Sequence, residues 1–490
     1  MKTLLRWLFR TLLALLVLLV LCIAALVAAN WRDDPLTPEA ARLLAPPAPP
    51  ASGASNAYYV LMGMDAPEGE DALAAGWRWH SDIDRQFREN PARTDYSEPP
   101  RIKTTCLRES TPTCDWGKLH CPLKGADCVN FYLSEKDRGQ RFMAEQSVLR
   151  QRYQEFSRIP VFDEPPMCSM YMPIPSYRFM AQAAEMNLMA AVLDFDKGDL
   201  AAGAQTLMQE IRVHLRLLAN GSLLVTKMIA VSMLRRDYAV LSDAIEHWPP
   251  LARQAELTEA WHPLSAREYD LRPTIASEAI LQAYSLSEWI QSQQKLHFAE
   301  FARQAMKEPY RSPWYVTLSS YFILPHATLN TFARWSDEDA QAIDGDAATI
   351  EARHAAQIAR REREFDQISP WSSWRFIRNP GGKILLFVGT DYFTYAERIH
   401  DIDGYIRLVV LQAALRRDDV PLTEVADYMQ HVAPDLRNPY DGQLMRWDAA
   451  SNTISFEGRQ KNNFNPEDTP KTFSVRLRFE SASTHQEKPP

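Results

Sequence analysis

The pattern of apolar and polar positions begins with an uninterrupted apolar stretch. Residues 11–29 carry no charge and are long enough for a helix to cross the hydrocarbon core of a bilayer. Lys2, Arg6 and Arg10 precede the stretch, and no acidic residue does. By the positive-inside rule, the N-terminus stays in the cytoplasm and the rest of the chain crosses the membrane. We therefore expect an uncleaved single-pass anchor in residues 1–30, with the membrane as its partner.

A cleaved signal peptide is the alternative for this first segment. Val27, Ala28 and Ala29 supply small residues before a cleavage site. The apolar stretch is, however, longer than the roughly 15 residues of a signal peptide's apolar region. The length and flanks favour the anchor.

Most of the remaining chain has the apolar period of amphipathic helices. In residues 177–246, apolar positions recur every three or four residues, and turns are expected at Lys197-Gly198-Asp199 and Asn220-Gly221-Ser222. Asp199 is a candidate N-cap for the helix that follows it. In the short apolar run 58–64, periodicity does not decide between a helix and a strand.

The period changes near the C-terminus. Residues 444–447, 453–456 and 472–479 have the composition or alternation of short strands, and Pro, Asp-Gly and Ser-Asn supply turns between them. These segments predict a small antiparallel sheet.

The predicted fold class is mainly α: a helical body with a small C-terminal antiparallel β element and a disulfide-tied N-terminal region. The Pro/Ala-rich stretch after the anchor is expected to be an extended spacer that holds the body off the membrane. The expected segments are an anchor (1–30), a Pro/Ala-rich linker (31–56), a Cys-containing N-terminal region (57–172), a helical body (173–435), a small β element (436–480) and a disordered tail (481–490).

The net charge bears on the class of partner, and the cysteines bear on the cellular compartment. The formal net charge of −8 argues against nucleic acid as a partner. In an oxidising compartment, cysteines beyond the membrane indicate disulfides. The alternative, zinc, lacks support because no C-x2-C pair is present. The number of candidates is odd, so one thiol is left over or pairs with another chain; the pairing stays open among Cys106, Cys114, Cys121, Cys128 and Cys168.

The segment ERIHDIDG holds the best candidates for catalysis. On a helix, Glu397, His400 and Asp401 share one face, which suits a metal or a general acid–base pair. A histidine bonded to a neighbouring carboxylate for purely structural reasons is the alternative. The sequence contains no HExxH, G-x-S-x-G or dinucleotide-binding motif, and we expect no cofactor.

A second cluster, in MCSMYMP, is rich in sulfur. The cluster comprises Met167, Cys168, Met170 and Met172, and soft sulfur ligands suit Cu(I). The alternative is that Cys168 forms a disulfide and the methionines fill gaps in a core.

Several longer segments carry a family resemblance. They are DCVNFYLSEKDRG followed by RYQEF, SLLVTKMIAVSMLRRDY, FILPHATLN, NPGGKILL, AERIHDIDGYIRLVVLQAALRR and NPYDGQLMRWD. Over most of residues 120–460 the chain resembles an uncharacterised family of single-pass, membrane-anchored helical proteins of Gram-negative bacteria. The resemblance implies an envelope location and a helical body, and no site.

These observations lead to a functional expectation. We expect a protein of the bacterial inner membrane with one span and its C-terminal body in the periplasm. Its expected role is interaction or assembly with an envelope protein partner, without catalysis. An enzyme with a cleft around His400 and Asp401 is the first alternative, and copper binding at residues 167–172 is the second.

Overall fold

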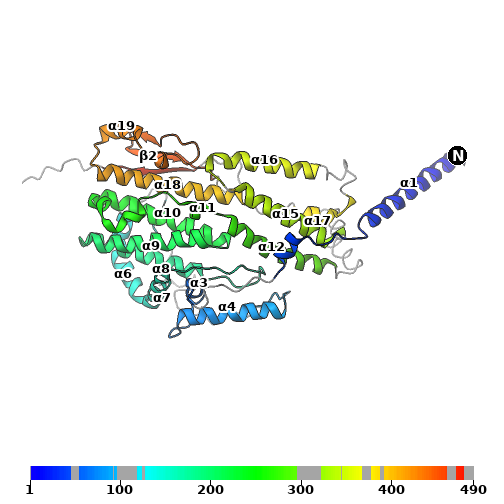
Figure 1. The fold of residues 1–490 in the computed structure, drawn as a ribbon, viewed down its shortest axis with the longest axis horizontal. Helices are drawn as coiled ribbons and strands as arrows, with labels where there is room; N and C mark the ends of the chain where they lie inside the picture. Colours follow the sequence, from blue (N-terminus) through cyan, green and yellow to red (C-terminus); the bar gives the residue numbers. More distant parts are fainter. Residues whose placement is uncertain are drawn as a thin grey trace, which may run out of the picture.

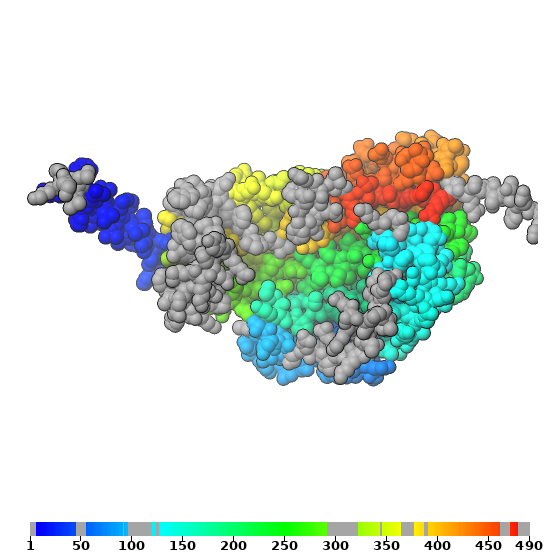
Figure 2. Space-filling view, turned by 180° about the vertical axis from the view of Figure 1, so that it is seen from behind, coloured from blue at the N-terminus to red at the C-terminus, as the bar shows by residue number. Residues whose placement is uncertain are grey.

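The computed structural model shows an elongated helical body from which one apolar helix projects. It describes residues 2–45, 55–91, 93–96, 119–123, 127–294, 322–343, 345–366, 377–386, 391–460 and 471–478. Helix α1 (Lys2–Ala29) leaves one end of the body, and the C-terminal strands lie toward the other end (Figure 1, Figure 2). Within the described residues, α1 is the one helix long and apolar enough to cross a membrane.

The body is built almost entirely from helices. Its α-helices are α2 (Pro38–Leu43), α3 (Ala57–Met62), α4 (Ala72–Glu89), α5 (Cys128–Ser134), α6 (Lys136–Glu145), α7 (Ser147–Arg158), α8 (Tyr177–Asp196), α9 (Leu200–Asn220), α10 (Leu224–His247), α11 (Ala266–Tyr269), α12 (Arg272–Gln294), α15 (Pro325–Ile343), α16 (Ala347–Asp366), α17 (Pro380–Leu386), α18 (Phe393–Arg417) and α19 (Val425–Gln430). Short 3-10 turns are η3 (Pro249–Arg253), η4 (Ala255–Ala260), η7 (Leu422–Glu424) and η8 (Pro434–Leu436).

The centre of the body is a stack of four long helices. Helix α8 packs on α9, α9 on α10, and α10 on α18 (Figure 1). The predicted turns between α8, α9 and α10 are confirmed, and the Asp199 carboxylate accepts a hydrogen bond from the Ala202 backbone N–H at 3.1 Å as the N-cap of α9. The helical body expected from the apolar period is therefore present.

Polar side chains lie inside this stack and are paired there. Glu210 on α9 accepts hydrogen bonds from the Tyr153 hydroxyl at 2.6 Å and the Asn187 amide at 2.8 Å. His214 Nδ1 lies 2.6 Å from Asp237 Oδ2 on α10. Buried polar groups that find partners across helices fix the relative positions of those helices.

The N-terminal region packs against one side of the stack and is tied by a disulfide. The ambiguous run 58–64 forms helix α3, which begins after the N-cap Asn56. Cys121 and Cys128 are bonded, which confirms the disulfide-tied region. The Cys121 N–H donates to Glu185 on α8 and the Cys128 N–H to Asp243 on α10, so both ends of the bridged loop are fixed to the core.

The C-terminal sheet matches the predicted strands. Strands β1 (Arg446–Asp448), β2 (Thr453–Glu457) and β3 (Thr472–Arg476) are antiparallel in the order β1-β2-β3, and Phe456 pairs with Phe473. The buried face of the sheet packs on α18. At Gly404, an added Cβ would lie 2.3 Å from the Phe456 ring, so the close approach of sheet and helix requires glycine.

The linker differs from the expected extended spacer over residues 31–45. Thr37 caps the short helix α2, and Ala40 packs into a small apolar cluster with Ala283 of α12 and Leu329 of α15. Leu36, Leu43 and Leu44 pack against that cluster. The proline content of the linker gave no indication of this contact. Residues 31–45 of the expected linker thus pack on the body, while residues 46–54, in the Pro/Ala-rich stretch expected to be the extended spacer, and the predicted tail at 481–490 lie outside the described residues.

Candidate functional site

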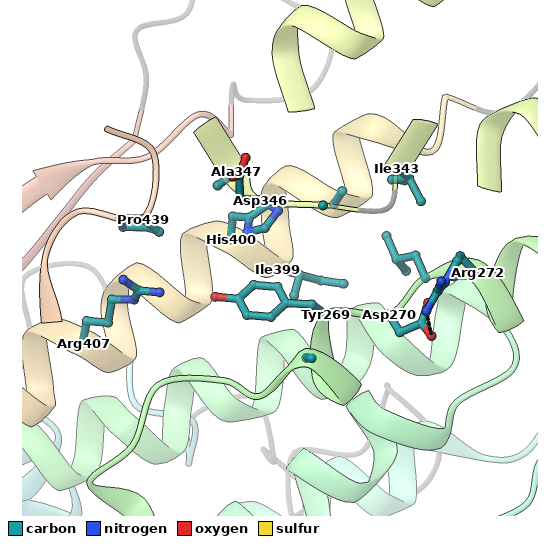
Figure 3. Close-up of a pocket in the computed structure, with 14 residues that line it drawn as sticks. Tyr269, Asp270, Arg272, Ile343, Asp346, Ala347, Ile399, His400, Arg407 and Pro439 are labelled. Atoms are coloured by element: carbon teal, nitrogen blue, oxygen red, sulfur yellow. Dashed lines mark hydrogen bonds and ion pairs between the residues drawn. The ribbon is translucent and has the colours of Figure 1, made fainter. Parts of the chain in front are cut away.

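The candidate site is a cavity of about 340 Å³ beside the middle of α18. Three further parts of the chain complete it: α11 with the start of α12, the junction between α15 and α16, and Pro439. Apolar side chains form part of the wall, among them Leu271, Ile343 and Ile399. Figure 3 shows the polar side chains that lie around it, namely Tyr269, Asp270, Arg272, Asp346, His400 and Arg407.

The charged side chains of the cavity are held by neighbours. Arg272 forms two parallel bonds to Asp270, Nε to Oδ1 at 2.8 Å and Nη2 to Oδ2 at 2.9 Å. Arg407 Nε donates to Asp403 at 2.5 Å, and Nη1 donates to the Arg437 carbonyl at 3.1 Å. A bidentate or doubly anchored guanidinium has a fixed orientation, so this part of the wall is preorganised.

Asp346 plays a similar structural role at the opposite wall. Its Oδ1 accepts hydrogen bonds from the Thr349 N–H at 3.0 Å and the Thr349 hydroxyl at 2.6 Å. These bonds satisfy donors at the beginning of α16 and lower the pKa of Asp346. The carboxylate is therefore ionised at neutral pH.

Of the three candidates Glu397, His400 and Asp401, His400 is the one among the described lining residues. Its side chain is buried, its ring lies 4.9 Å from the Tyr269 ring between centroids, and its Nδ1 has no hydrogen-bond partner among the residues that the structure describes. Burial, followed by the charges of Arg407 and Arg459, lowers the pKa of His400 to about 4. The imidazole is thus neutral at pH 7, with one nitrogen able to donate a hydrogen bond and the other to accept one.

Asp401 faces away from the cavity and holds the C-terminal segment. Its carboxylate accepts hydrogen bonds from the Tyr440 hydroxyl, the Arg459 N–H at 2.9 Å and the Gln460 N–H at 3.0 Å. Successive residues of a helix differ by about 100° in direction, which explains why His400 and Asp401 serve different surroundings.

Glu397 also lies outside the cavity lining. Burial, followed by the nearby charge of Asp401, raises the pKa of Glu397 to about 7. The three candidates of the ERIHDIDG segment therefore do not converge on one cavity. Among the described lining residues, no Ser, Thr, Cys or Lys side chain supplies a nucleophile.

The sulfur cluster divides between a second cavity and the surface. Met167, Cys168 and Met172 line a cavity of about 150 Å³ together with His80 of α4, whereas Met170 is 64% exposed. Cys168 is a free, buried thiol in the structure, so it does not form the disulfide expected as one alternative. Burial raises the pKa of Cys168 to about 12. Copper binding stays a prediction.

Of the other cysteine candidates, Cys121 and Cys128 pair with one another. Cys106 and Cys114 lie outside the described residues. No group of three or more His, Cys, Asp or Glu side chains suited to a metal occurs in the part of the chain that the structure describes.

The walls opposite His400 could not be identified from the sequence. Tyr269 and Arg272 belong to a segment of α11 and α12, and Asp346 to the junction before α16. The local signal at the first segment is the capping box of Ser265 and Glu268, which marks the start of a helix and not a site. No pattern in the sequence connects these segments with residue 400.

Comparisons with known proteins assign neither a family nor a function to the chain. The chain matches no family profile, no curated protein and no solved structure.

Proposed function

We propose that this chain is a membrane-anchored binding protein of the bacterial periplasm. Its body takes a small polar ligand into the His400 cavity and catalyses no reaction. The observation that carries this proposal is His400, whose side chain lines a preorganised cavity and whose Nδ1 has no hydrogen-bond partner among the described residues. Leaving a buried polar atom without a partner costs about 1–3 kcal/mol, and a ligand that bonds to it recovers that free energy.

The surroundings of His400 favour binding over catalysis. Asp401, which the enzyme alternative requires, already accepts three hydrogen bonds from the C-terminal segment. Asp270 and Asp346, which do line the cavity, are held by Arg272 and Thr349. A histidine that acts as a general base is oriented by a third group, and none of these three carboxylates is hydrogen-bonded to His400 among the described residues.

Two observations support the periplasmic location. Lys2, Arg6 and Arg10 precede the apolar part of α1, which favours a cytoplasmic N-terminus by the positive-inside rule. The Cys121–Cys128 disulfide suits an oxidising compartment. Together they support a single-pass protein of the inner membrane with its body in the periplasm.

The test is a ligand screen on the purified full-length protein in detergent. Small polar metabolites are added singly, and the unfolding temperature is measured for the wild type, H400A and a control variant, H431A, altered at an exposed histidine at the end of α19. We expect a ligand that stabilises the wild type and H431A but not H400A. If every stabilising compound acts equally on H400A, the proposed site is wrong.

A second candidate function is interaction with an envelope protein partner. The observation in its favour is the packing of residues 31–45 on the body, which holds the body in one orientation relative to α1. A partner could then recognise anchor and body together. Cross-linking in intact cells, followed by pull-down and mass spectrometry, should yield one stoichiometric partner, and its absence would count against this function.

A further inference from the structure

The outer end of α1 is bonded directly to the body. The last carbonyl groups of a helix lack partners within the helix. Arg378 Nη1 donates to the carbonyls of Ala29 at 2.9 Å and Arg32 at 3.2 Å. Asn30 and residues 377–379 bond reciprocally, because the Asn30 amide donates to the Ile377 carbonyl at 2.6 Å and the Asn379 N–H donates to Asn30 Oδ1 at 2.8 Å. We call this set of contacts the anchor clamp.

The residues after the anchor clamp continue the attachment. Asp33 accepts hydrogen bonds from the backbone N–H groups of His326 at 2.7 Å and Ala327 at 3.1 Å, at the start of α15. The Thr37 N–H donates to the Asn330 side chain at 2.8 Å. The residues that follow α1 are therefore hydrogen-bonded to the body from Asn30 to Thr37.

Side chains at this junction have the chemistry of a membrane interface. Trp31 is 77% exposed and follows directly on the apolar helix, where aromatic residues mark the headgroup level. A groove of about 690 Å³ runs from apolar residues of α1, such as Ile23 and Val27, to Arg32 and Arg378. With α1 across a bilayer, the apolar wall would lie at the depth of the hydrocarbon core and Arg32 at the depth of the lipid phosphates, while Arg378 is paired with Asp34.

From these contacts we propose that the body is seated on the membrane surface by the anchor clamp. The occupant of the groove is a phospholipid of the leaflet around the C-terminal half of α1, with its acyl chain along α1 and its phosphate beside Arg32. Helix α17, which begins immediately after Asn379, then lies at the headgroup level. This inference is independent of any ligand in the His400 cavity.

Photo-cross-linking in nanodiscs tests the proposal. The full-length protein carries benzoylphenylalanine in place of Lys383 on α17, in nanodiscs of phosphatidylethanolamine and phosphatidylglycerol. The same residue in place of Arg32 serves as the positive control, and in place of Arg446 on β1, at the opposite end of the body, as the negative control. We expect lipid adducts at positions 383 and 32, and none at 446.

The role of the anchor clamp is tested with the double variant N30A/R378A. It should lower the adduct yield at position 383 at least tenfold and leave the yield at position 32 unchanged, since residue 32 adjoins α1 whatever the body does. R141A, which alters an exposed arginine on α6, is the matched control. A flexible Gly-Ser insertion after Asn30 should act like the double variant without altering any clamp side chain.

Two results would overturn the proposal. In the first, position 32 forms lipid adducts and position 383 does not, which would place the body away from the membrane. In the second, the yield at position 383 persists in both N30A/R378A and the insertion variant.

Discussion

At the scale of single residues, two neighbours on α18 have opposite roles. His400 lines the cavity and has one nitrogen without a partner among the described residues, whereas the Asp401 carboxylate accepts hydrogen bonds from the segment around Arg459 and Gln460. The first role favours recognition of something outside the chain, and the second stabilises the fold. Substitutions at the two positions should therefore change different measurements.

Replacing Asp401 by alanine should destabilise the protein more than H400A does. D401A leaves the backbone N–H groups of Arg459 and Gln460 without an acceptor and leaves the Tyr440 hydroxyl only the Glu397 carbonyl, which costs about 2–4 kcal/mol in the free energy of unfolding. H400A removes ring contacts with Tyr269 and Tyr440, but it leaves no donor or acceptor of another described residue exposed at Nδ1, so its loss should be the smaller one. Urea unfolding of both variants checks the contrast, and equal losses in the two would contradict it.

His400 should also make stability depend on pH. Its pKa of about 4 lies below the usual 6.5, so the unfolded chain binds more protons between these values. The contribution of neutral His400 is fully present above pH 6.5 and is lost as the pH falls toward 4. Over that range the wild type should lose about 3 kcal/mol of stability relative to H400Q.

The comparison with H400Q is needed because buried carboxyl groups titrate in the same range. Burial raises the pKa of Glu210 to about 7, and the pKa of Glu397 is also raised to about 7. Their contributions have the opposite sign and are lost as the pH rises. Urea unfolding at a series of pH values gives the difference curve, and a flat curve would show that burial does not hold His400 neutral.

At the scale of elements, side chains from distant parts of the chain bond to backbone groups at helix ends that have no local partner. Glu164, in the loop before α8, accepts hydrogen bonds from the backbone N–H groups of Ser222 and Leu223 at the start of α10. Lys227 on α10 donates to the Leu218 carbonyl near the end of α9 at 2.5 Å. Both side chains are buried, so each cap also joins two elements.

Two substitutions at Glu164 should distinguish the contribution of its hydrogen bonds at the start of α10 from the contribution of its negative charge. E164A leaves the donors at the start of α10 unsatisfied and should cost about 3 kcal/mol of stability. E164Q keeps an oxygen for the backbone N–H groups, and its amide can donate to the hydroxyls of Tyr177 and Thr226. The loss in E164Q should be under about 1 kcal/mol. Thermal unfolding of both variants measures this, and similar losses in the two would argue against the cap.

The elements were more predictable than their contacts. Helices α8, α9 and α10 follow from a local apolar period and from turn residues such as Asp199, and the alternation around Phe473 gives a strand. The small cluster that holds α2 could not be predicted, because its partners on α12 and α15 lie far along the chain. For the same reason, the sequence suggested His400 but neither Tyr269 nor Arg272 opposite it.

At the scale of the whole molecule, the disulfide joins the N-terminal region to the core. Cys121 and Cys128 close a short loop whose ends bond to α8 and α10. Closing a loop of this length is worth about 2–3 kcal/mol through the entropy of the unfolded chain. C121S/C128S should lose that amount in the free energy of unfolding, measured by urea unfolding under oxidising conditions.

A reductant supplies the control for this prediction. Adding dithiothreitol should destabilise the wild type and leave C121S/C128S unchanged. If the variant also loses stability on reduction, another disulfide contributes. If neither responds, the Cys121–Cys128 bond does not stabilise the body.

The anchor clamp has a mechanical consequence for the assembled protein. Helix α1 has 28 residues and is about 42 Å long, and its outer end does not pivot freely against the body. A tilt of α1 relative to the bilayer would therefore turn the body by the same angle. The rotational phase of α1 is fixed as well, so inserting one residue in its middle would swing the body by about 100° around the helix axis relative to a partner bound to its N-terminal half.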